Sequence, residues 1–174
     1  MEEINKESIE YMLEEIPVGL SQIERILLTN ENTVQTLLSV IFNTPIDVII
    51  LHQVEVDRNT FIRWSKLVAA NKTVCIAQSY ITTDNEGFAT GIKEQNIGIG
   101  QLIAAKCLIT RRTIKKMYSD TMVFSRIYQI EDVGMTPNGS HINCLITEVF
   151  PKLVFSEACI EWNQSYIKNS KTKV

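Results

Sequence analysis

The 174-residue sequence lacks a long apolar run and lacks an excess of positive charge. No hydrophobic stretch approaches the roughly 20 residues that a membrane-spanning helix needs. The N-terminal residues are acidic, whereas a secretory signal is first basic and then apolar. Seventeen basic against twenty acidic residues give a net charge of −3, which creates no field to attract nucleic acid or an anionic membrane. We therefore expect a cytoplasmic protein that binds neither.

Potential metal ligands are also few, because the chain has two histidines and its four cysteines form no Cys-x-x-Cys pair. This spacing argues against a zinc site. We interpret the cysteines as small buried hydrophobic residues in a reducing compartment, in preference to a redox or metal-binding role. They are Cys75, Cys107, Cys144 and Cys159.

What the sequence does contain is typical of one globular domain. It has 45% hydrophobic and 21% charged residues, and it is long enough to bury a core without disulfides or metals. We therefore expect residues 1–174 to form a single domain.

The first 43 residues carry a helical pattern. An apolar stripe within residues 9–16 predicts one helix. Ser21 and Glu24 form a capping box that predicts the start of a second helix. Asn32 is expected to cap a third.

Runs of β-branched and aromatic residues replace the helical pattern from residue 46 onward. Short polar turns separate most of these runs, which favours antiparallel pairing. We therefore predict an α+β fold with a six-stranded, mainly antiparallel sheet and helices on one face. The predicted strands are 46–56, 61–70, 73–82, 107–118, 123–131 and 141–150.

Residues 84–105 interrupt the strands with two short predicted helices that contain four of the seven glycines. These glycines lower the intrinsic helix stability, as expected of a movable lid over one face of the sheet. The alternative is a surface excursion in which the glycines serve only as caps and turns, and from the sequence we favour it.

The C-terminal part, residues 153–174, predicts one more helix. Ser156 is expected to cap it, and its apolar side chains recur at helical spacing. We expect this stripe to pack on the domain rather than on a partner. The stripe comprises Phe155, Cys159, Trp162 and Tyr166.

Glu148 is the most unusual position, because it shares the face of an otherwise apolar strand with Ile146 and Phe150. A buried carboxylate needs a cationic partner, a bound proton or a cavity in which a ligand satisfies it. The alternative is a strand end that already tilts into water. An apolar enclosure would raise the pKa of this carboxyl and make it a general acid or base near neutrality.

Several arginines also lie within predicted strands. Arg63 stands between large apolar residues, where its guanidinium could grip a carboxylate at two points. Arg111, Arg112 and Arg126 occupy two later strands, and those that face the insertion would form a pocket for a dianion. The common alternative for a strand arginine is a solvated outer face.

A series of short motifs follows one another in a recognisable order. They are the runs 20–30 and 32–38, the strand with Arg63, the strand 76–81, the turn 97–100, and the stretches 108–112, 126–128 and 146–151. Over about residues 18–152, this order resembles that of the chorismate pyruvate-lyase-like proteins.

The resemblance implies an antiparallel sheet with helices on one side and flaps, including residues 84–105, over an internal pocket. It implies a cofactor-independent lyase that eliminates pyruvate from chorismate to give 4-hydroxybenzoate. Arg63 matches the arginine that grips the ring carboxylate, and Glu148 matches the glutamate that meets the ring oxygen of the product. Backbone amides near Gly100 would complete the carboxylate site.

One departure from that family concerns a second arginine, for which the matching residue here is Gln78. A neutral amide in that place would weaken binding of the enolpyruvyl carboxylate by roughly 1–2 kcal/mol. Arg111, Arg112 or Arg126 would then have to compensate.

The competing interpretation is a small-molecule binding module. The effector domains of GntR-type regulators share the implied fold and only sense a ligand. They follow a winged helix, whereas only three helices are predicted before the first strand here, so we favour an enzyme. A lyase that makes a different hydroxybenzoate isomer is a third interpretation, and the sequence fits a monomer or a homodimer.

Overall fold

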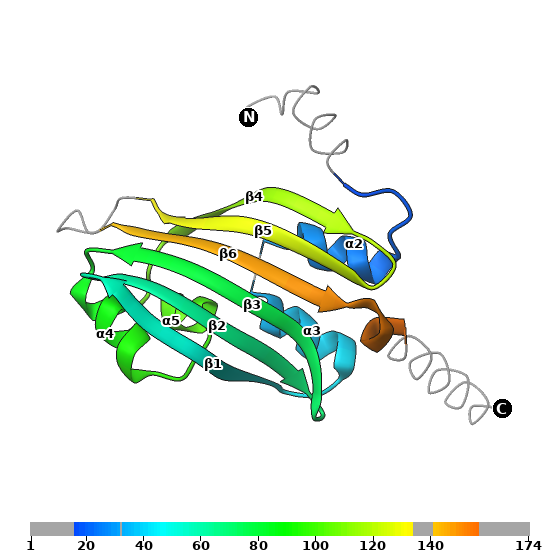
Figure 1. The fold of residues 1–174 in the computed structure, drawn as a ribbon, viewed down its shortest axis with the longest axis horizontal. Helices are drawn as coiled ribbons and strands as arrows, with labels where there is room; N and C mark the ends of the chain where they lie inside the picture. Colours follow the sequence, from blue (N-terminus) through cyan, green and yellow to red (C-terminus); the bar gives the residue numbers. More distant parts are fainter. Residues whose placement is uncertain (1–15, 32, 134–140, 157–174) are drawn as a thin grey trace, which may run out of the picture.

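The computed structural model describes residues 16–31, 33–133 and 141–156, in which two helices followed by three strands occur twice (Figure 1). The first set contains α2 (Gln22–Thr29), α3 (Val34–Phe42), β1 (Ile46–Asp57), β2 (Thr60–Ala69) and β3 (Lys72–Thr83). The second set contains α4 (Glu86–Glu94), α5 (Ile99–Ala105), β4 (Thr110–Ser119), β5 (Val123–Asp132) and β6 (Ile142–Pro151).

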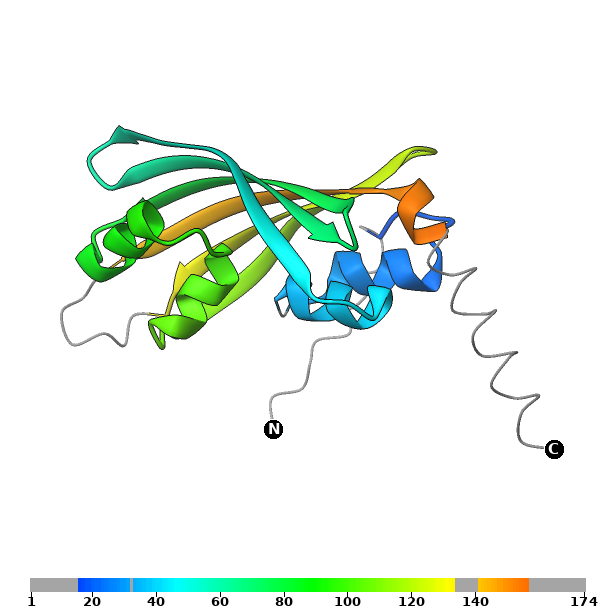
Figure 2. The same cartoon turned by 90° about the horizontal axis from the view of Figure 1, so that it is seen from below.

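The six strands form one sheet in the order β1-β2-β3-β6-β5-β4, and every neighbouring pair is antiparallel. The third strands of the two sets, β3 and β6, therefore meet at the centre of the sheet. Helices α2 to α5 lie on one face of the sheet (Figure 2). The predicted α+β class with a six-stranded antiparallel sheet is confirmed. None of the helices in the described ranges combines the length and apolar character needed to span a membrane.

Two apolar clusters fill the space between the helices and the inner face of the sheet. Under α4 and α5, Phe88 and Leu102 pack with Phe61. Under α2 and α3, Leu27 packs with Phe150. Along β2, β3, β5 and β6, buried side chains on the helix-covered face alternate for the most part with half-buried or exposed ones on the other face.

The 84–105 insertion belongs to this core, and two of its glycines lie where the helix backbone comes close to a neighbouring side chain. A Cβ on Gly91 would lie 2.5 Å from Cδ1 of Leu102, and a Cβ on Gly100 would lie 3.2 Å from Cγ2 of Thr33. Helix α5 therefore packs closely against α4 on one side and against the start of α3 on the other. The interpretation as a surface excursion with glycines only in caps and turns is wrong.

The predicted capping box of α2 is confirmed, because Ser21 Oγ accepts from Glu24 N at 3.3 Å and Ser21 N donates to Glu24 Oε2 at 2.7 Å. Helix α3 starts differently from the prediction. Its N-cap is Thr33, which makes no side-chain cap bond, and Asn32 lies outside the described residues.

The chain becomes helical again directly after β6, over residues 152–156. Ser156 lies inside this turn, and its hydroxyl donates to Lys152 O at 3.2 Å, so the prediction that Ser156 caps the helix is wrong. Pro151 explains the earlier start, since proline is well suited to precede or open a helix. Phe155 is buried in the core, as predicted. The helix predicted in 9–16, Cys159, Trp162 and Tyr166 lie outside the described residues.

The cysteines follow the prediction in two cases. Cys75 and Cys144 are buried free thiols, and burial raises the pKa of Cys144 to about 12 and also raises that of Cys75. Cys107 is exposed, contrary to the prediction, because it occupies a turn after α5 with φ of 52°.

Replacement of Gly91 by Ala should destabilise the fold by about 1 kcal/mol. The new methyl group would overlap the buried Leu102, at a cost of about 1–3 kcal/mol that exceeds the roughly 1 kcal/mol gain in helix propensity. Gly87→Ala in the same helix is the matched control, since its Cβ would meet only Asn85 Oδ1 at 3.4 Å, and it should be neutral or stabilising. Urea denaturation of both variants measures the difference, and equal stabilities would contradict the close packing of α4 on α5.

Candidate functional site

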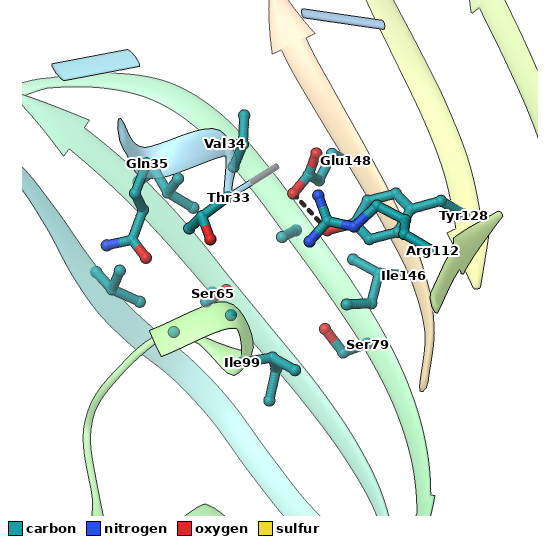
Figure 3. A pocket seen from close by; sticks show the side chains of 15 residues that line it. Thr33, Val34, Gln35, Ser65, Ser79, Ile99, Arg112, Tyr128, Ile146 and Glu148 are labelled. Atoms are coloured by element: carbon teal, nitrogen blue, oxygen red, sulfur yellow. Dashed lines mark hydrogen bonds between the residues drawn. The ribbon is translucent and has the colours of Figure 1, made fainter. Parts of the chain in front are cut away.

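A cavity of about 50 Å³ lies between the inner face of the sheet and the starts of α3 and α5 (Figure 3). Its roof consists of residues 33–35 and 98–100. Its floor includes the small side chains of Ser65, Ala77 and Ser79, followed by Ile146, Tyr128 and Glu148.

Glu148 lines this cavity and has both carboxylate oxygens bonded. Its Oε2 accepts from Nε of Arg126 at 2.7 Å, and its Oε1 accepts from the hydroxyl of Tyr128 at 2.8 Å. The residue is only 3% exposed, so the interpretation as a strand end that tilts into water is wrong. Of the three ways to satisfy a buried carboxylate, the structure shows a cationic partner.

The hydroxyl of Tyr128 remains a hydrogen-bond donor to this carboxylate at neutral pH. Burial, followed by the charge of Glu148, raises the pKa of Tyr128 well above its ordinary value. The phenol therefore stays protonated at neutral pH and fixes one oxygen of Glu148 while Arg126 fixes the other.

Arg126 is completely buried and links the ion pair to a helix. Its Nη1 donates to Leu27 O at 2.8 Å and also to Asn30 O, which are carbonyls at the C-terminal end of α2. A cation is favourable there because the last carbonyls of a helix lack intrahelical partners and carry partial negative charge. Arg126 thus joins α2 to β5 and, through Glu148, to β6.

Arg63 occupies the same place in the first set that Arg126 occupies in the second. Each is the fourth residue of the middle strand, β2 or β5. Arg63 Nη2 donates to Gln95 O at 3.4 Å, the C-cap carbonyl of α4, as Arg126 donates to Asn30 O, the C-cap carbonyl of α2. Each arginine therefore contacts the end of the first helix of the other set.

The two arginines differ in the residue that faces them on the neighbouring strand. Arg126 faces Glu148, whereas Arg63 faces Ser79. Arg63 is 2% exposed, and its Nε and Nη1 have no hydrogen-bond partner among the described residues. Burial lowers the pKa of Arg63 to about 10, so the group is still cationic at neutral pH. Beside the cavity floor there is thus a buried cation that lacks a counter-ion in the described part of the chain.

Arg111 and Arg112 are consecutive in β4 and point to opposite sides of the strand. Arg111 is 68% exposed and lies 3.9 Å from Glu131, at the range limit of an ion pair. Arg112 points into the cavity, with its guanidinium carbon 4.5 Å from the centre of the Tyr128 ring (Figure 3). Of the two, only Arg112 joins Glu148 and Tyr128.

Gln78 lies on the outer, exposed face of the sheet, so the prediction that it shares a pocket with Arg63 is wrong. Strand side chains alternate, and a register shift between Leu67 and Val68 makes Ser79 the residue opposite Arg63.

The structure brings some of the predicted site residues together and separates others. Glu148 and Gly100 line the cavity, and Arg63 lies beside its floor, opposite Ser79. Arg126 bonds Glu148 and a carbonyl of α2, and Arg111 lies on the exposed side of β4.

Tyr128 and Ser79 were not among the predicted site residues. Strict alternation would have placed Tyr128 on the same face as Arg126, and Ser79 on a face shared with other small residues of β3. The recurrence of Phe-x-Arg at the same point of two strands, 61–63 and 124–126, was the available signal for the repeated arrangement.

Within the described ranges, no group of three or more His, Cys, Asp or Glu side chains is arranged to hold a metal ion. A scan of the chain against protein-family models finds no match, and a search of curated proteins finds none either. The function has to be inferred from the residues of the site.

Substitution of the two arginines by methionine should separate their roles. Arg126→Met leaves Glu148 buried without a cation and should lower the free energy of unfolding by about 3–5 kcal/mol. Arg63→Met removes a buried charge that has no counter-ion among the described residues, and it should change the free energy of unfolding by less than about 1 kcal/mol. Chemical denaturation measures both, and an equally large loss for Arg63→Met would show that this arginine is structural.

Proposed function

We propose that the cavity binds an aromatic carboxylate and that the chain eliminates pyruvate from chorismate to release 4-hydroxybenzoate without a cofactor. The binding proposal is carried by Arg63, whose buried Nε and Nη1 have no partner among the described residues. A ligand carboxylate over Ser79 would accept from this guanidinium at two points and supply the counter-ion that Glu148 supplies to Arg126.

The ring of the ligand would extend from Arg63 across the floor of the cavity. Arg63, Ser79, Ile146 and Tyr128 are successive cross-strand partners on β2, β3, β6 and β5. Four neighbouring strands span roughly 14 Å, a distance that an arginine side chain and a benzoate ring can bridge together. The ring oxygen of 4-hydroxybenzoate would then lie near Tyr128 and Glu148.

The elimination breaks the bond between the ring and the ether oxygen of the enolpyruvyl group. A hydrogen leaves the neighbouring ring carbon as a proton, and the methylene of enolpyruvate gains a proton to become pyruvate. Formation of the aromatic ring drives the reaction, so the protein has to orient the substrate and move one proton. Glu148, held in place by Arg126 and Tyr128, is the carboxylate proposed to take the ring proton.

The cavity has to widen for this reaction, because pockets for ligands of this kind usually exceed about 300 Å³. Its roof is formed where Gly98 and Gly100 meet Gln35 and Thr33 at the starts of α5 and α3. We propose that these two helix starts separate to admit the ligand, since this movement leaves the sheet and its ion pair intact. Their return would exclude water from the ring.

We also propose that the protein acts in the cytoplasm and has no nucleic-acid partner. The thiols of Cys75, Cys107 and Cys144 are free, as is usual in a reducing compartment. The net charge of −3 gives no general attraction to polyanions.

One observation favours a second candidate, a non-catalytic domain that senses an aromatic acid as the effector domains of GntR-type regulators do. Both oxygens of Glu148 already accept hydrogen bonds, from Arg126 and Tyr128. In that case Glu148 only holds β5, β6 and α2 together, and the ligand binds at Arg63 without reacting.

Chorismate turnover distinguishes the two candidates. The wild-type protein incubated with chorismate should release 4-hydroxybenzoate and pyruvate in equal amounts, measured by chromatography. Arg63→Met, which keeps the ion pair of Arg126, should be at least about 100-fold slower because the ring carboxylate loses its charged partner. Saturable binding of 4-hydroxybenzoate without turnover would establish the sensor, and absence of both would refute the carboxylate site.

Replacement of Ser79 by Asp tests directly whether Arg63 binds the carboxylate of the ligand. The new carboxylate would face Arg63 and compete with the ligand, so affinity for 4-hydroxybenzoate should fall by at least about tenfold while the unfolding midpoint rises. Ser79→Asn has the same size without the charge and should keep more affinity with no gain in stability. Calorimetry and thermal unfolding measure both quantities, and identical behaviour of Asp and Asn would contradict the role of Arg63.

A further inference from the structure

We infer that a second copy of this chain packs on the outer face of the sheet, so that two sheets lie face to face in a dimer. Helices α2 to α5 all lie on the inner face, and none of these four covers the outer one (Figure 2). The inference does not rest on the proposed function, because the cavity lies on the helix side of the sheet.

Apolar side chains gather on the outer face of β1, β2, β3 and β6. Four of them are successive cross-strand partners and form one row across these strands. Five of the six that form the group are between 38% and 48% exposed, and Ile62 is half-buried. We call this group the outer patch, and it consists of Val54, Ile62, Tyr80 and Leu145 in the row, with Trp64 and Ile76 beside it.

The outer patch is not a requirement of the fold, because the equivalent strands of the second set present more polar side chains on this face. Ser125 on β5 stands where Ile62 stands on β2, one residue before the buried arginine. The edge strand β4 presents Arg111 and Lys116 on this side. Its counterpart β1 contains neither lysine nor arginine. Basic residues on an edge strand discourage contact with other sheets, and only β4 has this protection.

The composition of the outer patch is that of the core of a protein interface. Such cores are enriched in tryptophan and tyrosine and depleted of charge. In the three rows from β1 to β6 that contain the patch, Lys66 is the only Lys, Arg, Asp or Glu. A strongly charged partner is therefore disfavoured, and a partner with a similar apolar face is favoured.

The size of this face fits a dimer. A fourth row of uncharged polar residues, Thr60, Thr82 and Asn143, borders the patch at the ends of β2, β3 and β6. At about 4.8 Å per strand and about 3.3 Å per residue, four strands and four rows cover about 500 Å². Two copies would bury about 1,000 Å² together, which is the least that a specific interface normally needs. A contiguous apolar patch of this size commonly marks an interaction site.

Two identical sheets are suited to each other because they have the same twist. Sheets that pack face to face align their strands to within about 30° and interdigitate their side chains. A two-fold contact uses the same surface of both copies, so the apolar residues of one patch meet those of the other. The helices of both copies remain on the outside of such a dimer, and both cavities stay accessible to a ligand.

Sedimentation equilibrium tests the inference on the wild-type chain. The mass should rise from 19.8 kDa towards twice this value as the concentration increases from about 1 to about 200 μM, as expected of a small interface. A mass of 19.8 kDa over the whole range would overturn the inference.

Two identical substitutions test whether the dimer uses the outer patch. Tyr80 and Tyr118 are 48% and 50% exposed on the same face of the sheet, but Tyr118 lies on β4, outside the patch. Tyr80→Arg would bury one unpaired charge from each copy and should weaken dimerisation at least about tenfold. Tyr118→Arg is the matched control and should stay within about twofold of wild type. Thermal unfolding midpoints at about 1 μM show whether both variants fold, and equal dissociation constants would overturn the inference.

Acrylamide quenching of Trp64 gives a second readout that needs no change in the patch. The chain has two tryptophans, so Trp162→Phe leaves Trp64 as the only one. Its fluorescence should be readily quenched at concentrations where the chain is a monomer and shielded where it is a dimer. A dimer that leaves Trp64 accessible would overturn the inference. Shielding at every concentration would also overturn it, because another part of the same chain would then cover the patch.

Discussion

The buried ion pair between Arg126 and Glu148 is the interaction on which the rest of the arrangement depends. Removal of both charges from water costs several kcal/mol each, and such a pair is favourable only when its remaining donors and acceptors are satisfied. Here the hydroxyl of Tyr128 satisfies the second oxygen of Glu148, and the terminal carbonyls of α2 accept from Nη1 of Arg126, whereas its Nη2 has no partner among the described residues. The same few atoms thus fix the order of β5 and β6, the position of α2 above them, and the direction in which the Glu148 carboxylate faces the cavity.

The other half of the molecule repeats this construction with one part missing. Arg63 has the place of Arg126 and contacts the end of α4, yet Ser79 stands where a carboxylate would complete the pair. An apolar residue at position 63 would avoid the cost of a buried cation that has no counter-ion in the described ranges, so local stability does not explain the arginine. A ligand that brings its own carboxylate does explain it. The asymmetry between two equivalent positions is therefore a stronger indication of a binding site than the burial of either arginine alone.

The sequence predicts well those features that depend on neighbouring residues. The capping box at Ser21 and the six strands involve interactions over a few positions, and both are observed. The partner of Glu148 is 22 residues away, and the strand pairing that joins them could not be read from local periodicity. Gln78 was misplaced for a related reason. Strand faces alternate with every residue, so a register shift of one position exchanges a pocket residue for an exposed one. The strand pattern singled out Glu148 and Arg63, and the resemblance to chorismate lyases suggested a role for each, whereas the structure supplied the contrast between their surroundings.

A missing counter-ion also couples ligand binding to stability. A ligand that binds only the folded protein stabilises it by about 2.7 kcal/mol at a concentration 100 times its dissociation constant. For Arg63 this gain includes relief of a charge that is otherwise buried without a partner in the described part of the chain. In the proposed binding, part of the binding energy would be spent on separating the starts of α3 and α5, because the cavity holds only about 50 Å³. The carboxylate of the ligand is the group best able to supply that energy, since its interaction with Arg63 forms deep in the core where water does not weaken it. Under the proposed function, recognition of the ring carboxylate and opening of the roof would therefore be parts of one equilibrium. A ligand without that carboxylate would lack the interaction that favours the open site.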